Sequence, residues 1–282
     1  MARRIRIDAE LVRRGLARSR QHASELLTAG HVLLDGEVVT KPARQVDPAQ
    51  ALRVDVSTTD DYVSRGAHKL AGALDALGGD APVVAGRRCL DAGASTGGFT
   101  DVLLRRGAAQ VVAVDVGYGQ LAWSLQTDPR VTVLDRTNVR TLTPEMVAPA
   151  PGLVVGDMSF ISLTLVLPAL ARAAAPDADL LLMVKPQFEV GKERLGHGGV
   201  VRDTALHVES VLTVAAAAAG LGLDTWAVVP SPLPGPSGNV EYFVALRRNH
   251  PRALRGEALA GAAAAAVRTG PAGPPAPEQE AP

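Results

Sequence analysis

The sequence predicts an α/β protein in which helices cover a mainly parallel sheet with an antiparallel last strand, preceded by a small α+β domain. Short apolar runs alternate with helical stretches, as expected when each parallel strand is followed by a crossover helix. A glycine-rich turn follows the first run, and a proline-rich segment joins the last two. The expected strands are Cys89–Leu90, Val111–Val114, Val131–Leu134, Leu153–Val155, Leu180–Val184, Trp226–Val229 and Tyr242–Leu246.

The N-terminal region, residues 1–59, predicts a compact module with two helices and a hairpin. One helix is expected to start at Ile7–Val12 and a second, capped by serine, over Ser19–Leu27. Val32–Val39 holds an Asp-Gly pair between apolar residues, which is a strong hairpin signal. The first twenty residues contain seven arginines and two acids, although the formal net charge of the chain is zero. Positive charge is therefore concentrated in this module.

The glycine-rich turn predicts a site for a nucleotide-like cofactor. Gly93, Gly97 and Gly98 follow the first strand and open a helix, so the backbone can turn tightly against a ligand. Asp115 ends the second strand with a carboxylate suited to ribose hydroxyls. The spacing is not G-x-G-x-x-G, and this segment alone leaves open a site for NAD or a purely structural turn.

The end of the sheet favours S-adenosyl-L-methionine as the cofactor. Pro230–Asn239 is too rich in proline for a helix, so it joins the last two strands as a hairpin. An antiparallel final pair is expected of the Rossmann-like sheet of S-adenosylmethionine-dependent methyltransferases. Ligands of open α/β sheets lie beyond the carboxyl ends of the strands. The polar residues that end these strands are Asp91, Asp115, Asp157 and Lys185.

Composition bounds the class of protein. The chain has 282 residues, of which 47% are hydrophobic, enough for a full core and a second small domain. Its single cysteine, Cys89, excludes an intramolecular disulfide and fits a reducing cytoplasm. No apolar run approaches the roughly 18 residues that span a membrane. The six histidines are scattered, so we expect no metal site. Together with the single cysteine and the short apolar runs, this predicts a cytoplasmic protein with no membrane contact.

The regions that flank the larger domain, residues 64–249, differ in composition from it. Asp60–Val63 indicates a short linker over residues 60–63. From about His250 the sequence becomes alanine-rich and then proline-rich, which predicts a disordered tail over residues 250–282.

Several motifs resemble those of one family and occur in the same order. The N-terminal module resembles the alpha-L RNA-binding motif of small-subunit ribosomal protein four, and the whole chain from about Ile5 to Leu246 closely resembles the TlyA family. The motifs that carry the resemblance are Arg6-x-Asp8-x-x-Leu11, Ser19-Arg20, Gly30-x-Val32, Asp35-Gly36, Ser64–Leu70, Gly156–Ser162 and Val184–Glu189. The resemblance implies an FtsJ-type rRNA methyltransferase with haemolysin-like names, which methylates the 2'-hydroxyl of cytidine in small- and large-subunit rRNA.

Ribose methylation needs a group that removes a proton, because a ribose hydroxyl is a poor nucleophile at neutral pH. A lysine can do this when burial or a neighbouring cation disfavours its charged form. Lys69 and Lys185 supply a pair of lysines. Asp157 and Glu241, at strand ends, are placed to orient them. The resemblance implies that these four form a Lys-Asp-Lys-Glu tetrad in which Lys185 acts on the hydroxyl.

Three members of the expected tetrad also have structural explanations. Lys69 fits a solvated helix lysine, and Glu241 fits a surface acid on an edge strand. Asp157 fits the cap of a helix that begins near Ser159. Lys185 is harder to dismiss, since it directly follows an apolar strand and precedes a proline.

Cofactor binding is expected from the loop after the first strand and from the ends of the next two strands. We expect the loop backbone on the methionine and ribose, Asp115 on the ribose hydroxyls, and Asp91 on the loop or the amino group. Asp135 and Asn138 are expected at the adenine edge, with turn capping left open. The expected cofactor residues are Asp91, Gly93, Ala94, Ser95, Gly97, Gly98, Asp115, Asp135 and Asn138.

RNA binding is expected to depend on phosphate contacts and on the shape of folded rRNA within ribosomal subunits, because aromatic residues make up only 3% of the chain. The alternative is an ordinary solvated basic face. We also expect the loop Gly191–Gly199 to close over the substrate. The expected RNA contacts are Arg4, Arg6, Arg18, Arg20, Lys41, Arg65, Lys192 and Arg194.

Other function classes remain to be weighed. A haemolysin would need a membrane-active segment, and Val211–Leu223 is too short and alanine-rich. A non-catalytic ribosome-binding assembly factor would bind the same RNA, but the lysine pair argues against it. A base methyltransferase more often has an Asn/Asp-Pro-Pro-aromatic turn where this chain has Asp157–Phe160. No obligate protein partner is evident. Asp60–Val63 also departs from the basic, tryptophan-containing tetrapeptide that the resemblance implies, which puts coupling between the domains in doubt.

Overall fold

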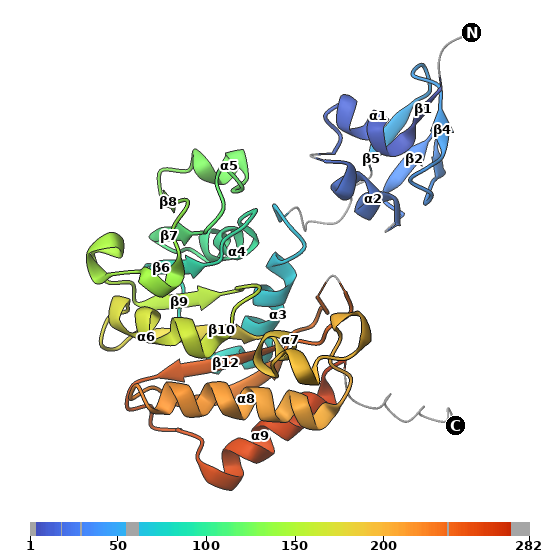
Figure 1. The fold of residues 1–282 in the computed structure, drawn as a ribbon. Helices are drawn as coiled ribbons and strands as arrows, with labels where there is room; N and C mark the ends of the chain where they lie inside the picture. The colour runs from blue at the N-terminus through green and yellow to red at the C-terminus, as the bar shows by residue number, and fades with distance from the viewer. Residues whose placement is uncertain (1–3, 18, 29, 55–61, 236, 272–282) are drawn as a thin grey trace. The chain divides into compact units, whose positions relative to one another are not determined.

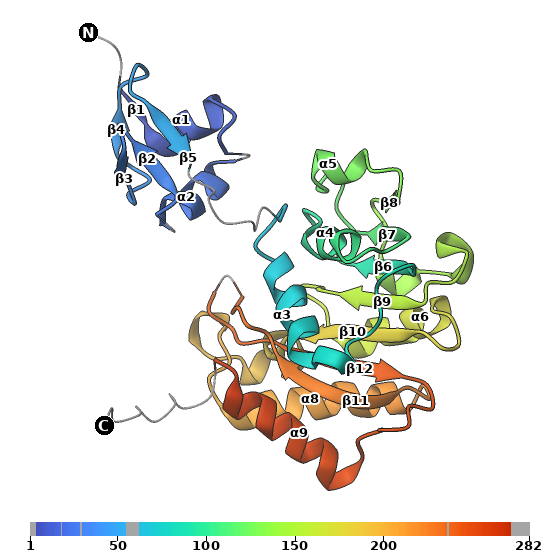
Figure 2. The same cartoon turned by 180° about the vertical axis from the view of Figure 1, so that it is seen from behind.

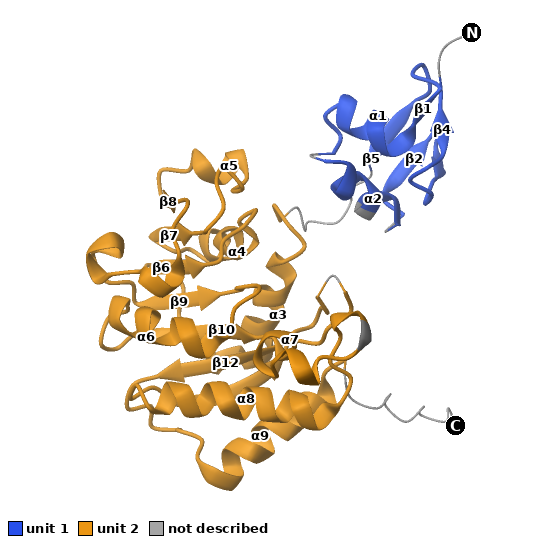
Figure 3. Cartoon of the chain, viewed as in Figure 1, with its two compact units in different colours: residues 1–61 blue, residues 62–282 orange. Residues whose placement is uncertain are grey.

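The protein folds into two compact units, residues 1–61 and 62–282, in a computed structural model (Figure 3). The structure describes residues 4–17, 19–28, 30–54, 62–235 and 237–271. Asp60 and Asp61 of the expected linker lie outside the described residues. Tyr62 and Val63 belong to the second unit, where the Val63 amide donates to Asp101 Oδ2 at 2.8 Å.

The first unit contains the two helices and the hairpin that the sequence predicts, together with short strands that it does not. Asp35 (φ 53°) and Gly36 (φ 90°) both have the left-handed backbone that a tight hairpin turn requires. The strands form a two-stranded sheet, β1-β4, and a three-stranded sheet, β3-β2-β5. The elements are β1 (Ile5–Arg6), α1 (Ile7–Arg13), α2 (Arg20–Thr28), β2 (Val32–Leu34), β3 (Glu37–Val38), β4 (Gln45–Val46) and β5 (Leu52–Val54).

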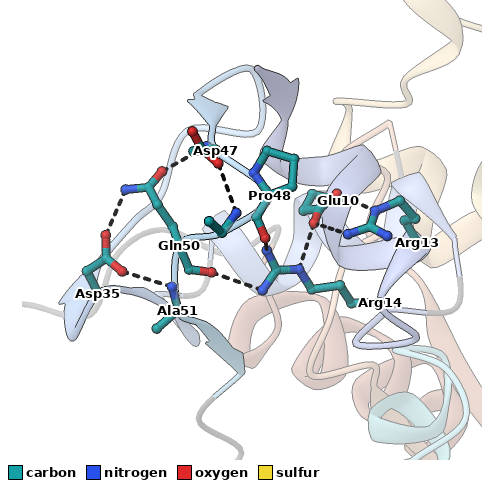
Figure 4. Close-up of polar contacts among 9 residues, drawn as sticks. Glu10, Arg13, Arg14, Asp35, Asp47, Pro48, Gln50 and Ala51 are labelled. Carbon is teal, nitrogen blue, oxygen red and sulfur yellow. Dashed lines mark hydrogen bonds and ion pairs between the residues drawn. The ribbon is translucent and has the colours of Figure 1, made fainter. Parts of the chain in front are cut away.

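Polar contacts fix helix α1 against the chain that precedes β5 (Figure 4). Glu10 is fully buried and accepts hydrogen bonds from Arg13 and Arg14, and Arg13 holds the pKa of this carboxyl down at about 2. Arg14 also donates to the carbonyls of Pro48 and Gln50, at 2.7 and 3.0 Å. A buried acid is therefore fully paired, and the small apolar core of this unit is supplemented by these bonds.

The second unit is built on a seven-stranded sheet in the order β11-β12-β10-β9-β6-β7-β8. Strand β12 is antiparallel to both of its neighbours, whereas β10, β9, β6, β7 and β8 are parallel. All seven strands and the antiparallel final pair were predicted from the sequence. The strands are β6 (Arg88–Ala92), β7 (Gln110–Val114), β8 (Val131–Leu134), β9 (Leu153–Gly156), β10 (Asp179–Val184), β11 (Asp224–Pro230) and β12 (Tyr242–Arg247).

Helices cover both faces of this sheet. Alternate strand residues face opposite sides: Leu182 packs in the cluster that contains α6, α8 and α9, and Leu181 packs in the cluster that contains α3 and α4. Helix α8 lies in front of the sheet in Figure 1, and α3 lies in front of it in Figure 2. The helices are α3 (Ala67–Leu77), α4 (Gly98–Arg105), α5 (Trp123–Gln126), α6 (Leu163–Ala173), α7 (Pro186–Glu189), α8 (Thr204–Ala219) and α9 (Gly256–Thr269).

The predicted disordered tail is wrong for residues 250–271. Residues Gly256–Thr269 form helix α9, which lies against α8 and β11. Alanine is the strongest helix former, and the side chains of Ala263, Ala266 and Val267 are buried along one stripe of the helix. Residues 272–282 lie outside the described residues. No helix in the described part of the chain combines the length and apolar character needed to cross a membrane.

Helix α9 is expected to contribute to the stability of the second unit. Val267→Asp places an unpaired charge at a site that is 4% exposed, so the free energy of unfolding should fall by about 3 kcal/mol. Arg268→Asp, at the exposed neighbouring position, is the matched control and should change it by less than about 0.5 kcal/mol. Urea unfolding followed by circular dichroism measures both. Equal stabilities of the two variants would mean that α9 does not pack on the sheet.

Candidate active site

The four residues of the expected tetrad meet at the carboxyl edge of the parallel strands. Asp157 follows β9 and Lys185 follows β10, which are neighbours in the sheet. Glu241 directly precedes β12, and because that strand is antiparallel its start lies at the same edge. Lys69 comes from α3. Chain segments far apart in the sequence thus bring two cations and two anions together.

Ion pairs connect the four side chains into a closed cluster. Lys185 Nζ lies 2.5 Å from Asp157 Oδ1 and 4.0 Å from Glu241 Oε1. Lys69 Nζ lies 2.5 Å from Glu241 Oε2 and 3.9 Å from Asp157 Oδ2. Each charge therefore has two neighbours of opposite sign, as buried charges require.

Burial of the cluster tests the structural explanations of Lys69 and Glu241. The side chains of both lysines are 8% exposed, and that of Glu241 is 1% exposed. Lys69 is therefore not a solvated helix lysine, and Glu241 is not a surface acid. Helix α6 is capped by Ser162, whose hydroxyl accepts from the Thr164 amide, so Asp157 does not cap it.

Glycines allow the backbone to come close around the cluster. A Cβ atom on Gly93 would lie 2.9 Å from the backbone oxygen of Asp157, so the loop after β6 touches the loop after β9 directly. A Cβ atom on Gly235 would lie 2.9 Å from Glu241 Oε1, in the proline-rich segment before β12. On Gly98 it would lie 2.8 Å from the Ala67 amide at the start of α3. Side chains at these positions would push apart the segments that carry the tetrad.

A hydroxyl and an aromatic pair, none of them expected from the sequence, border the cluster. Lys185 Nζ donates a hydrogen bond to Ser159 Oγ at 2.9 Å. Phe160 has a left-handed backbone (φ 63°) and a side chain that is 92% exposed. Its ring centroid lies 5.3 Å from that of Phe188, whose ring lies 6.0 Å from Lys185 Nζ. An exposed aromatic after a strand-end aspartate is the signal that could have pointed to Phe160.

A half-buried carboxylate, that of Glu189, joins the two loops that carry Asp157 and Lys185. Glu189 Oε2 accepts from Ser162 Oγ at 2.6 Å, and Oε1 accepts from the Leu163 amide at 2.8 Å. Burial raises the pKa of this carboxyl. Since Glu189 lies at the end of α7 and Leu163 begins α6, the carboxylate ties the loop after β9 to the loop after β10.

The expected cofactor loop has the predicted shape, but most of its amides are already used. The Gly93 and Ala94 amides both donate to the Val114 carbonyl, and the Gly97 amide donates to the Ala94 carbonyl. The Ser95 amide donates to Asp115 Oδ2 at 2.8 Å. These four amides therefore donate within the chain, and contact of the loop backbone with a ligand stays a prediction. The carbonyls of Ala94, Thr96 and Gly97 likewise accept from amides of the chain.

Two carboxylates beside this loop fit a cationic, hydroxyl-bearing ligand. Asp115 spans the Ser95 and Gly117 amides through its two oxygens, which leaves further lone pairs for hydroxyl groups. Asp91 is fully buried and accepts from Thr100 at 2.7 Å through Oδ2. Within the described residues, Asp91 Oδ1 has no hydrogen-bond partner. Burial, followed by the charges of Asp157 and Asp115, raises the pKa of Asp91 to about 7.

The two residues expected at the adenine edge make local contacts. Asp135 Oδ2 accepts from the Gly119 amide at 2.8 Å. Asn138 caps the 3₁₀-helix Val139–Thr141 by accepting from the Arg140 amide at 3.0 Å. The turn-capping alternative is therefore correct for Asn138, and contact of either residue with an adenine stays a prediction.

In the first unit, two of the expected RNA contacts converge on one acid. Arg6 and Arg20 both donate to Asp8, at 2.8 and 3.0 Å, and the bond from Arg6 holds the pKa of Asp8 down at about 2. Their side chains are 44% and 61% exposed. Arg4 and Lys41 are exposed, and Arg18 lies outside the described residues.

The expected RNA contacts of the second unit differ in how they are held. Arg65 donates to the Pro234 carbonyl at 2.9 Å, and Arg194 donates to Glu209 at 2.7 and 2.8 Å. Lys192 is exposed. In the part of the chain that the structure describes, no group of three histidine, cysteine or acidic side chains is placed to hold a metal ion.

Comparison with known proteins identifies the class. The family model of FtsJ-like methyltransferases matches residues 62–248, and the S4 domain model matches residues 5–52. The chain therefore is an FtsJ-like methyltransferase with an S4 domain. The structure of a putative haemolysin from Streptococcus thermophilus is similar, with a TM-score of 0.73 and 35% identity over 95% of this chain and 97% of that one.

The most informative relatives narrow the class. The Mycobacterium tuberculosis (strain H37Rv) protein called 16S/23S rRNA (cytidine-2'-O)-methyltransferase TlyA is 61% identical over 96% of this chain and 100% of its own length. Putative rRNA methyltransferase YqxC of Bacillus subtilis is 41% identical, over 86% of this chain and 85% of its own. Haemolysin A of Brachyspira hyodysenteriae is 34% identical, over 85% and 98%. The chain belongs to the TlyA family.

The buried acid Asp91, near the end of β6, gives the free energy of unfolding an unusual pH dependence. The pKa of Asp91 is about 7 in the folded protein against 3.8 ordinarily, so the folded state holds a proton that the unfolded state has lost. Stability therefore falls as pH rises between these values, by up to about 4 kcal/mol. Asp91→Asn cannot titrate and keeps an oxygen for Thr100. Relative to wild type, its free energy of unfolding should rise from pH 4.5 to pH 8.

Denaturant unfolding at several pH values measures this difference. Asp177→Asn, at an exposed acid, is the control and should follow wild type at every pH. A difference between wild type and Asp91→Asn that is the same at pH 4.5 and pH 8 would contradict protonation of Asp91 by burial.

Proposed function

We propose that this enzyme transfers a methyl group from S-adenosyl-L-methionine to the 2'-hydroxyl of a cytidine in small-subunit rRNA, large-subunit rRNA or both, in the cytoplasm. The observation that carries the proposal is the buried cluster of Lys69, Asp157, Lys185 and Glu241 beside the glycine-rich loop. A methyltransferase that acts on a hydroxyl needs a proton acceptor next to its cofactor site. The Mycobacterium tuberculosis relative named above carries this activity in its name.

Lys185 is the residue that takes the hydroxyl proton. The cofactor supplies an electrophilic methyl group on a sulfonium. Asp157, at 2.5 Å, orients the Lys185 amine, and Lys69 and Glu241 neutralise each other at the far side of the cluster. Because these side chains are held by ion pairs before the substrate arrives, much of the rate comes from positioning.

The loop after β6 is suited to hold the cofactor. The methionine ammonium is a donor, and Asp91 Oδ1 is a buried acceptor without a partner among the described residues. Asp115 retains lone pairs for the ribose hydroxyls. Asp135 and Asn138 follow β8 and are proposed to contact the adenine in addition to the local bonds that they make.

Binding of rRNA is assigned to exposed cations, and each of the two units has its own set of them. Arg6 and Arg20 are held by Asp8 with their guanidinium groups still accessible. Lys192 is exposed near the loop after α7. Phe160 presents an open aromatic surface beside the catalytic lysine, on which an unstacked base can pack. The expected contacts of Arg4, Lys41, Arg65 and Arg194 are part of the same proposal.

Removing the catalytic lysine should abolish methyl transfer. Lys185→Ala loses the proton acceptor, so transfer should fall by at least about a hundredfold. The assay uses tritiated S-adenosylmethionine with unmodified ribosomal subunits, and primer extension at low nucleotide concentration locates the label on a ribose. Lys192→Ala, a lysine outside the cluster, should keep kcat and weaken rRNA binding. RNA binding by the wild type without transfer to either subunit would favour a ribosome-binding assembly factor.

The paired arginines of the first unit should contribute to RNA affinity through charge. Arg20→Ala removes one phosphate contact, so rRNA binding should weaken and the slope of log K against log salt should fall by about one. Arg13→Ala is the matched control, because Arg13 also pairs with a buried acid but is not an expected RNA contact. Filter binding across a series of salt concentrations measures both slopes. An unchanged slope for Arg20→Ala would remove this residue from the interface.

A further inference from the structure

The loop after β9 carries a hydroxyl with no role in the reaction as described so far. Ser159 follows Asp157 by two residues, and its Oγ accepts a hydrogen bond from Lys185 Nζ at 2.9 Å. Ser159 is exposed, whereas the Lys185 side chain is 8% exposed. The buried amine therefore has one neutral partner, and that partner lies at the solvent side of the cluster.

This hydroxyl distinguishes the two lysines of the cluster. The two close neighbours of Lys69 Nζ are carboxylates, at 2.5 and 3.9 Å. Lys185 Nζ has Asp157 at 2.5 Å and Ser159 at 2.9 Å, with Glu241 farther away at 4.0 Å. The carboxylate distances of the two lysines are closely matched, so the bond to Ser159 is what sets Lys185 apart.

A neutral amine has two N–H bonds and one lone pair. When Asp157 and Ser159 each accept one N–H bond of Lys185, the remaining tetrahedral direction is fixed for the lone pair. We propose that Ser159 is a positioning residue for methyl transfer, which aims the lone pair of Lys185 at the substrate hydroxyl. This inference rests on the proposed function, because it requires a hydroxyl that loses a proton.

Ser159 is itself fixed on both sides. Met158, before it, is 7% exposed and packs in the core beneath α6. Ser162, after it, is bound by Glu189 at 2.6 Å. A hydroxyl held between two anchors can orient an amine without losing much conformational freedom when the substrate binds.

Methyl transfer to a hydroxyl releases one proton. The hydroxyl oxygen forms a bond to the methyl carbon as the carbon–sulfur bond breaks, and the electrons of that bond remain on sulfur. The hydroxyl proton moves to the Lys185 amine, which becomes an ammonium group. After the product leaves, the ammonium gives this proton to water at the exposed side of the cluster, where Ser159 lies.

The test compares Ser159→Ala with Ser159→Thr, Thr127→Ala and wild type in the full-length protein with unmodified ribosomal subunits. Ser159→Ala should lower kcat about tenfold and leave KM for S-adenosylmethionine and for the subunits unchanged. The acidic limb of its kcat profile should move to lower pH, because the ammonium form loses an acceptor. Ser159→Thr keeps a hydroxyl and should restore both properties.

Thr127→Ala removes an exposed hydroxyl between α5 and β8 that donates to the Trp123 carbonyl. It should leave kcat and the pH profile unchanged. An unchanged kcat and pH profile in Ser159→Ala, with wild type active and Lys185→Ala inactive, would overturn the inference and leave the proposed function standing. Inactive wild type would instead contradict the proposed function.

Discussion

The pairing of four charges, three of them buried, constrains the rest of the catalytic unit. The four residues, which come from three strand ends and one helix, are Lys69, Asp157, Lys185 and Glu241. Lys69, Lys185 and Glu241 are buried and need the opposite charges that the cluster supplies. The order of the sheet follows from this requirement in part. Strand β12 must run antiparallel between β10 and β11 for Glu241, which precedes it, to reach the carboxyl edge where Lys185 ends β10.

Close backbone packing supports this cluster and brings it next to the glycine-rich loop after β6. The loop of Gly93 touches the Asp157 backbone, and Gly98 lets α4 approach the start of α3, which carries Lys69. A group bound against the glycine loop therefore lies directly beside the cluster of two lysines and two acids. Glu189 adds a second link, since it fixes the loop after β9 to the loop after β10. The two functions of the site are held by one framework.

The central strands could be predicted from the sequence because parallel strands buried on both faces are continuous apolar runs, as β7, β9 and β10 are. The tetrad was predicted from its motifs, because pairing across distant segments leaves no local signal. The role of Ser159 could not be predicted, since it depends on which side of the loop reaches Lys185. Helix α9 was missed because an alanine-rich, weakly apolar stretch resembles a disordered tail until the surface that buries it is known.

The occupied amides of the cofactor loop show why a motif and its chemistry need separate arguments. A glycine-rich turn after a strand predicts exposed N–H groups, but here the Gly93 and Ala94 amides bond the Val114 carbonyl and the Ser95 amide bonds Asp115. The carbonyls of Ala94, Thr96 and Gly97 also bond within the chain, so the backbone of the turn does not by itself select a ligand. The selective groups are the carboxylates beside the turn. Asp91 Oδ1, which has no partner among the described residues, suits a ligand that donates hydrogen bonds, as a methionine ammonium does.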